Sequence, residues 1–157
     1  MTTADLLYAY QTASQIFHDN IGIPESGNGV PDILDEARYE IEWMLKMQDS
    51  SGGVHHKVTC AAFPGYVMPE EETDELIVTP IFTTATADFC GTMALAYEFY
   101  QEIDADFAKQ CLDAGEKAWD FLAENPNLIF KNPADIVTGE YGDNSDRDER
   151  YWAAAQM

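Results

Sequence analysis

The stretch TATADFCGTMALAYEFYQEIDADFAKQCLDAGEKAWDFLAENP, residues 84–126, decides the fold class. Apolar residues recur at helical spacing in both of its halves, which predicts two amphipathic helices. Asp104 fits the N-cap of the second helix, and Asn125 with Pro126 marks its end. Small residues in the first half allow a close neighbour. We therefore predict a helix over residues 84–102 and a second one antiparallel to it.

The same periodicity appears on both sides of this pair. Residues 5–17 carry an apolar stripe, with Thr2 or Thr3 available to cap it, and residues 31–48 carry another. A last helix is expected to begin near Ser145. The chain is therefore expected to be an all-α fold of antiparallel helical hairpins, with residues 1–157 forming a single domain.

A long irregular loop interrupts the helical pattern after residue 48. DSSGGVHHKVTC, residues 49–60, has a Gly-Gly turn and then a short alternating run, whereas residues 63–80 are rich in proline and acids. This pattern predicts a loop with two short strands. Connections of this length are uncommon in compact domains and are often functional.

Composition excludes some classes of partner. Eight basic residues against 29 acidic ones give a net charge of -21, which repels phosphate backbones and anionic lipids, so we expect neither nucleic acid nor a membrane as a partner. Cys60, Cys90 and Cys111 match neither a disulfide framework nor a paired-cysteine zinc site and are interpreted as packing thiols. We find no signal peptide and no transmembrane stretch in the sequence as given.

Several stretches in the same order resemble the catalytic domain of glycoside hydrolase family nine, the inverting cellulases. The resemblance implies a partial section, early to middle, of an (α/α)6 barrel with a groove for β-1,4-glucan across one end. It covers nearly the whole chain and rests on IPESGNGVPDILDEARYEIEWMLKMQ (23–48), GGVHHKVT (52–59), TATADFCGTMALAYEFY (84–100) and TGEYGDNSDRDERYWAAA (138–155).

The resemblance implies a secreted endo-β-1,4-glucanase that hydrolyses cellulose-type polysaccharides without an organic cofactor. The family's catalytic base lies in an Asp-Ala-Gly-Asp turn and its acid is a glutamate near the far end of the domain. Neither is found in this sequence, so the catalytic residues are unknown and an inactive fragment is expected. Two alternatives stay open: a non-catalytic glucan-binding module, and a helical module that forms a homo-oligomer through exposed apolar helix faces.

The acidic stretch before the last helix is a candidate metal site. The resemblance implies a Ca²⁺ site here, and oxygen ligands in a glycine-bearing loop suit that ion. The alternative interpretation is a solvated helix start, because Ser145 and Asp148 nearly form a capping box. The candidate ligands are Asp143, Ser145, Asp146, Asp148 and Glu149.

Candidate substrate contacts are His55, His56, Lys57 and Tyr141. The resemblance places the histidine stretch near the glucan groove, and Tyr141 offers an aromatic face in a loop beside the acids. Adjacent histidines point to alternate sides of an extended chain, which argues against a shared zinc ion. Asp88, within an apolar helix, is interpreted as structural.

Overall fold

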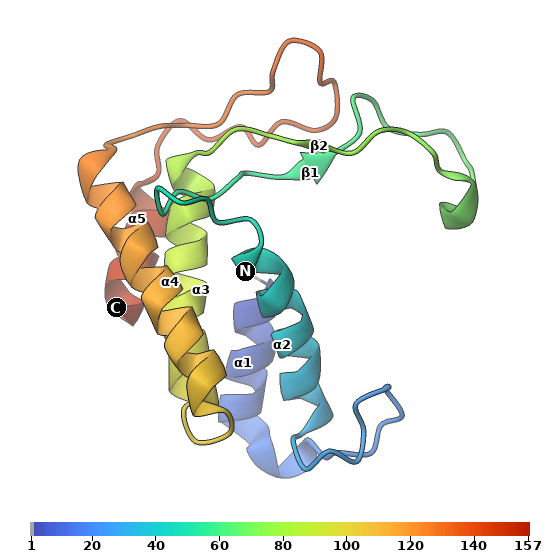
Figure 1. Ribbon diagram of the computed structural model, residues 1–157, viewed down its shortest axis with the longest axis vertical. Helices are drawn as coiled ribbons and strands as arrows, with labels where there is room; N and C mark the ends of the chain where they lie inside the picture. Colours follow the sequence, from blue (N-terminus) through green and yellow to red (C-terminus); the bar gives the residue numbers. More distant parts are fainter. Residues whose placement is uncertain (1) are drawn as a thin grey trace.

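The computed structural model describes residues 2–157 and is mainly helical (Figure 1). The predicted helical hairpins are confirmed, with boundaries that differ from the predicted ones by a few residues. The α-helices of the described residues are α1 Thr2–Ala13, α2 Asp32–Leu45, α3 Thr83–Tyr100, α4 Ala105–Glu124 and α5 Arg147–Gln156, and short 3₁₀ helices span Ser14–Ile16 and Pro69–Glu71.

Helix α3 is the centre of the structure. It packs against α4 and α5 and also contacts α1 and α2, which is why most of its residues are buried. Cys90 on α3 and Cys111 on α4 are buried, and burial raises the pKa of each thiol to about 12, so both act as packing groups. Asp104 caps α4 as predicted, because its carboxylate accepts a hydrogen bond of 3.0 Å from the Phe107 amide.

Helices α1 and α2 form a second hairpin. Helix α1 begins at Thr2, so Thr2 and Thr3 lie inside its first turn, and neither is the cap that the sequence suggested. It ends at Ala13, and the chain continues as the 3₁₀ turn. The Tyr100 hydroxyl of α3 donates a hydrogen bond to the Leu34 carbonyl of α2, which ties the two hairpins together.

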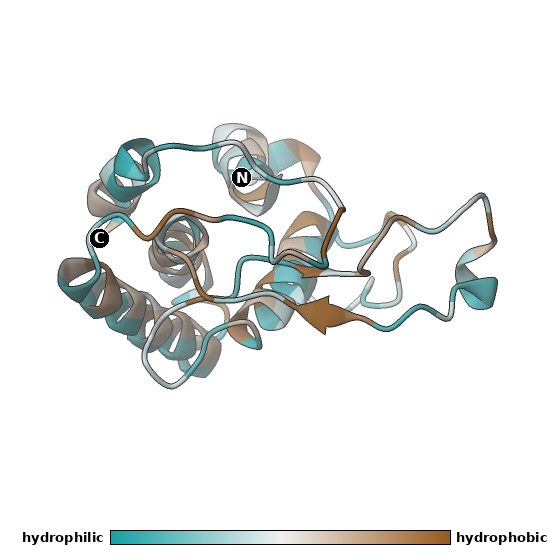
Figure 2. Cartoon of the chain, turned by 90° about the horizontal axis from the view of Figure 1, so that it is seen from above, coloured by the Kyte–Doolittle hydropathy of each residue, from teal (hydrophilic) through white to brown (hydrophobic). Residues whose placement is uncertain are grey.

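The long loop after α2 contains a small hairpin. Strands β1, Val58–Thr59, and β2, Ile77–Val78, pair antiparallel, so the predicted short strands are confirmed. The segment between the strands extends away from the helices (Figure 2). No helix among residues 2–157 is both long enough and apolar enough to cross a membrane.

The segment between α4 and α5 returns across this hairpin. The Thr83 amide at the start of α3 donates to the Leu128 carbonyl at 2.9 Å, and the Val137 amide donates to the Ala61 carbonyl at 2.8 Å. Helix α5 then packs on α3. As a result, the β-hairpin, the returning segment and the starts of α3 and α5 meet at one end of the helices (Figure 1).

Candidate active-site cleft

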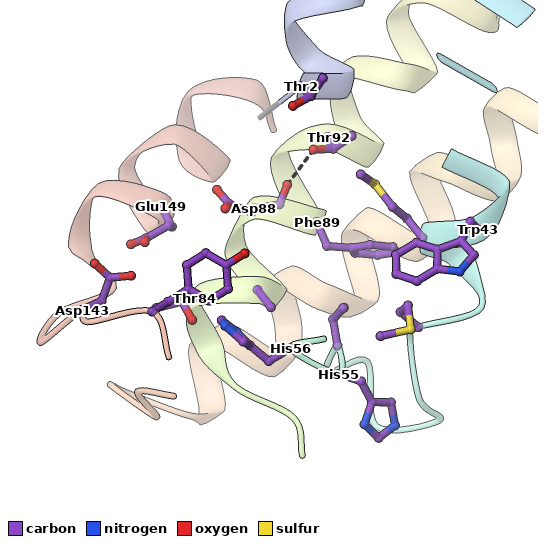
Figure 3. A pocket seen from close by; sticks show the side chains of 15 residues that line it. Thr2, Trp43, His55, His56, Thr84, Asp88, Phe89, Thr92, Asp143 and Glu149 are labelled. Atoms are coloured by element: carbon purple, nitrogen blue, oxygen red, sulfur yellow. Dashed lines mark hydrogen bonds between the residues drawn. The ribbon is translucent and has the colours of Figure 1, made fainter. Parts of the chain in front are cut away.

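A cavity of about 470 Å³ opens where these elements meet. In Figure 3, Asp143 and Glu149 lie at one end of it and Trp43 at the other, with Asp88 and His56 between them. The cavity combines aromatic, imidazole and carboxyl groups. Its lining is formed by Thr2, Trp43, Met44, Met47, Val54, His55, His56, Thr84, Ala85, Asp88, Phe89, Thr92, Tyr141, Asp143 and Glu149.

His56 is the most constrained side chain of this cavity. Its ring stacks on Phe130 with 3.9 Å between centroids and meets the Tyr141 ring edge-on at 5.2 Å. Both ring nitrogens are buried and have no hydrogen-bond partner among the described residues. Burial, assisted by the neighbouring Lys57, lowers the pKa of His56 to about 4. The imidazole is therefore neutral at pH 7, with one donor and one acceptor available to a ligand.

The depressed pKa of His56 predicts a pH-dependent stability. The imidazole of His56 binds a proton near pH 6.5 in the unfolded state and only near pH 4 in the folded state. The contribution of neutral His56 to the free energy of unfolding is therefore fully present above pH 6.5 and is lost as the pH falls towards 4. Because the ring is only partly buried, we expect about 1–2 kcal/mol, less than the full linkage. The measurement is urea unfolding of the wild type and His56→Gln between pH 4 and pH 8.

The free energy of unfolding of the wild type should fall below that of His56→Gln only towards low pH. His18→Gln is the matched control and should keep the wild-type profile, because it replaces an exposed histidine that follows α1 and lies outside the cavity. Parallel curves for the wild type and His56→Gln would contradict the prediction.

His55 and Lys57 flank His56 but have other partners. His55 Nδ1 lies 2.7 Å from the Thr79 carbonyl oxygen, while Lys57 donates to the Gly139 carbonyl at 2.8 Å and to Thr138 Oγ1 at 3.2 Å. Lys57 therefore joins the β-hairpin to the segment that carries Tyr141. Tyr141 is 62% exposed and also borders a second cavity of about 310 Å³ together with Lys57.

The acidic stretch before α5 divides into two parts. Asp146 is buried and pairs with Arg150 at 2.9 Å, and Arg150 also donates to the Leu122 and Asn125 carbonyls. Ser145 Oγ accepts a hydrogen bond from the Arg147 amide at 3.3 Å. These two residues stabilise the start of α5, whereas Asp143 and Asp148 are exposed.

Glu149 has the most unusual environment of these acids. Burial first, and then the neighbouring Asp148 and Asp88, raise its pKa to about 7, and Oε2 is buried without a partner among the described residues. Burial also raises the pKa of Asp88. Such a group either holds a proton near neutral pH or has its charge balanced by a bound cation.

The structure adds residues that the sequence pattern did not indicate. Thr84 lines the cavity with a buried hydroxyl that has no partner among residues 2–157, and Asp88, interpreted as structural, also lines it. Nothing in the helical periodicity distinguishes either residue from a packing residue. Their position depends on how α5 and the β-hairpin fold over the start of α3.

No catalytic pair can be assigned from sequence motifs in this cavity. The sequence Asp113-Ala-Gly-Glu116 comes closest to the Asp-Ala-Gly-Asp pattern, but it lies inside α4. Asp113 accepts a salt bridge from Lys109 at 2.7 Å, and both side chains are exposed. This motif therefore has no part in the cavity.

The structure thus combines antiparallel helical hairpins with a cavity of aromatic and acidic residues at one end. Residues 1–157 match glycosyl hydrolase family 9 along their whole length. The chain belongs to this family, and its fold is a partial section of the family's (α/α)6 barrel.

Individual relatives agree with this assignment. Endoglucanase D of Acetivibrio thermocellus is 45% identical over 137 residues, covering 86% of this chain and 22% of that protein. A metagenome-derived family 9 endoglucanase superposes with a TM-score of 0.93 at 42% identity, covering 99% of this chain and 29% of that one. AaCel9A in complex with cellobiose-like isofagomine superposes with a TM-score of 0.86 at 36% identity, covering 98% of this chain and 30% of that one. The chain thus spans less than a third of the length of these relatives.

Proposed function

We propose that this chain forms one wall of the substrate groove in a secreted endo-β-1,4-glucanase. One observation supports this proposal above the others. Buried polar atoms without partners among residues 2–157 gather in the same cavity: both nitrogens of His56, the hydroxyl of Thr84 and Oε2 of Glu149. Buried polar groups are normally paired, so such a group of unpaired atoms is expected where a polar ligand binds.

The chemistry of the cavity suits a neutral sugar chain. A glucose ring has an apolar face and a rim of hydroxyls, so it needs both an aromatic platform and hydrogen-bonding groups. Tyr141 offers an exposed ring, and the neutral His56 offers a donor and an acceptor beside it. The relatives include an endoglucanase and a protein in complex with cellobiose-like isofagomine, which supports this proposal. The proposed substrate class is therefore β-1,4-glucan.

Calcium is proposed for the acidic segment before α5. Asp143, Asp148 and Glu149 supply oxygen donors, and a bound Ca²⁺ ion would balance the charge of Glu149, whose pKa is raised to about 7. Asp146 is instead held by Arg150, so its carboxylate and Ser145 are the less available candidates. Affinity for Ca²⁺ should rise with pH through 7, because the ion competes with a proton on Glu149.

The test is calorimetry of the 157-residue chain with cellohexaose, run with calcium. We expect binding that weakens at least about tenfold, or 1.4 kcal/mol, in Tyr141→Ala and in His56→Ala. Tyr151→Ala is the matched control, because Tyr151 is an exposed tyrosine of α5 that lines none of the cavities described here. Equal affinities in all four proteins, or no heat in any, would contradict a glucan-binding wall.

Self-association is the second candidate. The segment between β1 and β2 exposes apolar side chains, among them Phe63 at 74% and Leu76 at 68%, and exposed apolar patches favour protein contacts. This candidate predicts a homo-oligomer. If light scattering gives the molar mass of a monomer up to high protein concentration, self-association is excluded.

A further inference from the structure

Three carboxylates converge at the opposite end of α2 from the cleft. Asp19 belongs to the loop that follows α1, whereas Asp32 and Asp35 lie in the first turn of α2. One oxygen of each lies within 4.8 Å of the others. Helical spacing explains why Asp32 and Asp35 share a face, but Asp19 reaches them only because the loop folds back.

The loop backbone orients these carboxylates. Asp19 accepts hydrogen bonds from the Gly27 amide and, at 2.7 Å, from the Gly29 amide, and both glycines have positive φ. These hydrogen bonds lower the pKa of Asp19, so it is ionised at neutral pH. Asp35 accepts from the Asn28 side chain at 3.1 and 3.2 Å.

Helix capping does not explain why the carboxylate of Asp32 is buried. Its side chain is fully buried, and Oδ2 accepts hydrogen bonds from the Ile21 amide at 2.6 Å and from Ser26 Oγ at 2.9 Å. Its other oxygen, Oδ1, is buried with no partner among the described residues. The ion pairs found in residues 2–157 also leave all three carboxylates without a basic side chain. A buried carboxylate oxygen of this kind is costly unless something positive lies beside it.

We propose that Asp19, Asp32 and Asp35 bind a divalent cation of the Ca²⁺ type. The available donors are all oxygens, which suits Ca²⁺ rather than zinc or copper, and Ca²⁺ accepts irregular sites completed by carbonyls and water. The ion clamps the loop of residues 18–31 onto the start of α2. It is separate from the acidic segment before α5, because the two clusters lie at opposite ends of the helical hairpins (Figure 1).

A second group that includes acidic side chains shows why proximity alone is insufficient. Cys60, Glu72 and Asp74 also bring ligand atoms within 4.8 Å of one another. None of the three is fully buried, and none has a buried unpartnered atom among the described residues. This group therefore supplies a control for nonspecific calcium binding.

The experiment measures calcium binding by calorimetry and by the calcium-induced rise in melting temperature, after treatment with EGTA. The 157-residue chain carrying Asp148→Asn and Glu149→Gln is the starting protein, so that ions at the segment before α5 are not counted. We expect one binding event that raises the melting temperature. Adding Asp19→Asn should weaken it at least about tenfold, whereas adding Asp74→Asn should leave it unchanged.

The outcomes separate the two clusters. Calcium binding that disappears with Asp148→Asn and Glu149→Gln alone, or that survives Asp19→Asn, would overturn the proposal. Asp32→Asn is a second variant with the same expected loss. If its buried position prevents folding, Asp19→Asn still decides, because Asp19 is partly exposed and its folding can be checked by circular dichroism. The result does not depend on whether the chain binds glucan.

Discussion

The purified 157-residue chain is expected to release no reducing sugar from a soluble β-1,4-glucan. Inverting hydrolysis needs a carboxylic acid that protonates the leaving oxygen and a carboxylate that activates water, about 6.5–9.5 Å apart. Each group typically contributes about 10²- to 10⁴-fold in rate, so a chain without both groups is expected to show turnover below detection. The resemblance to family nine assigns these roles to motifs that residues 1–157 do not contain.

Glu149 in the cleft is the group that could make this prediction of no turnover wrong. Glu149 has a pKa raised to about 7 beside other carboxyl groups, which is the environment of a general acid in many glycosidases. If Glu149 acted with Asp143 or Asp88, the chain alone would be active. We interpret the raised pKa instead as the effect of burying a carboxyl group that a cation would neutralise, and this interpretation predicts no turnover.

The measurement is reducing-sugar release from carboxymethyl cellulose between pH 5 and pH 8, with calcium and with chelator. Endoglucanase D of Acetivibrio thermocellus is the positive control. Turnover that is lost in Glu149→Gln or in Asp143→Asn would show that catalysis resides in this cleft and would overturn our assignment. Glucan binding without turnover would agree with a groove wall.

The helices could be predicted from the sequence because their signals are local. The apolar period of residues 84–126, the cap at Asp104 and the stop at Pro126 all act within a few residues, and the structure confirms them. Helix α1 was less well predicted, because the period continues past Ala13 while the backbone tightens into a 3₁₀ turn. A periodic pattern does not mark that change.

The properties of the site depend on contacts between distant segments. The structure places His55, His56 and Tyr141, three of the candidate substrate contacts, in the lining of one cavity, and their role as substrate contacts stays a prediction. The low pKa of His56, however, comes from burial against Phe130, which follows it by more than seventy positions. The cluster of Asp19 with Asp32 likewise requires the exact turn of the intervening loop. No spacing rule in the sequence indicates either arrangement.

Two alanine substitutions of buried helical glycines are expected to have opposite effects on stability. A Cβ atom at Gly91 on α3 would lie 2.6 Å from Cε3 of Trp152 on α5, whereas one at Gly115 on α4 would lie 3.4 Å from its nearest neighbour, Met93 Cβ. Alanine gains about 1 kcal/mol over glycine in a helix, and overpacking costs about 1–3 kcal/mol. We therefore expect Gly115→Ala to stabilise slightly and Gly91→Ala to destabilise by about 1–2 kcal/mol.

The larger consequence of Gly91→Ala concerns the cleft. Trp152 and Glu149 lie on the same helix, α5, so displacement of the indole is expected to shift this helix and to reduce the burial of Glu149, which is the main cause of its raised pKa. We expect the raised pKa of Glu149 to return towards its ordinary value, together with weaker calcium and glucan binding. Urea unfolding measures the loss of stability, and the pH dependence of calcium affinity measures the change at Glu149.

A double variant tests the contact between Gly91 and Trp152 directly. Combining Gly91→Ala with Trp152→Leu, which removes the indole ring, should restore part of the stability through a coupling of about 1 kcal/mol or more. Equal effects of the two alanines, or strictly additive effects in the double variant, would show that the packing of α5 on Gly91 does not position the acidic end of the cleft.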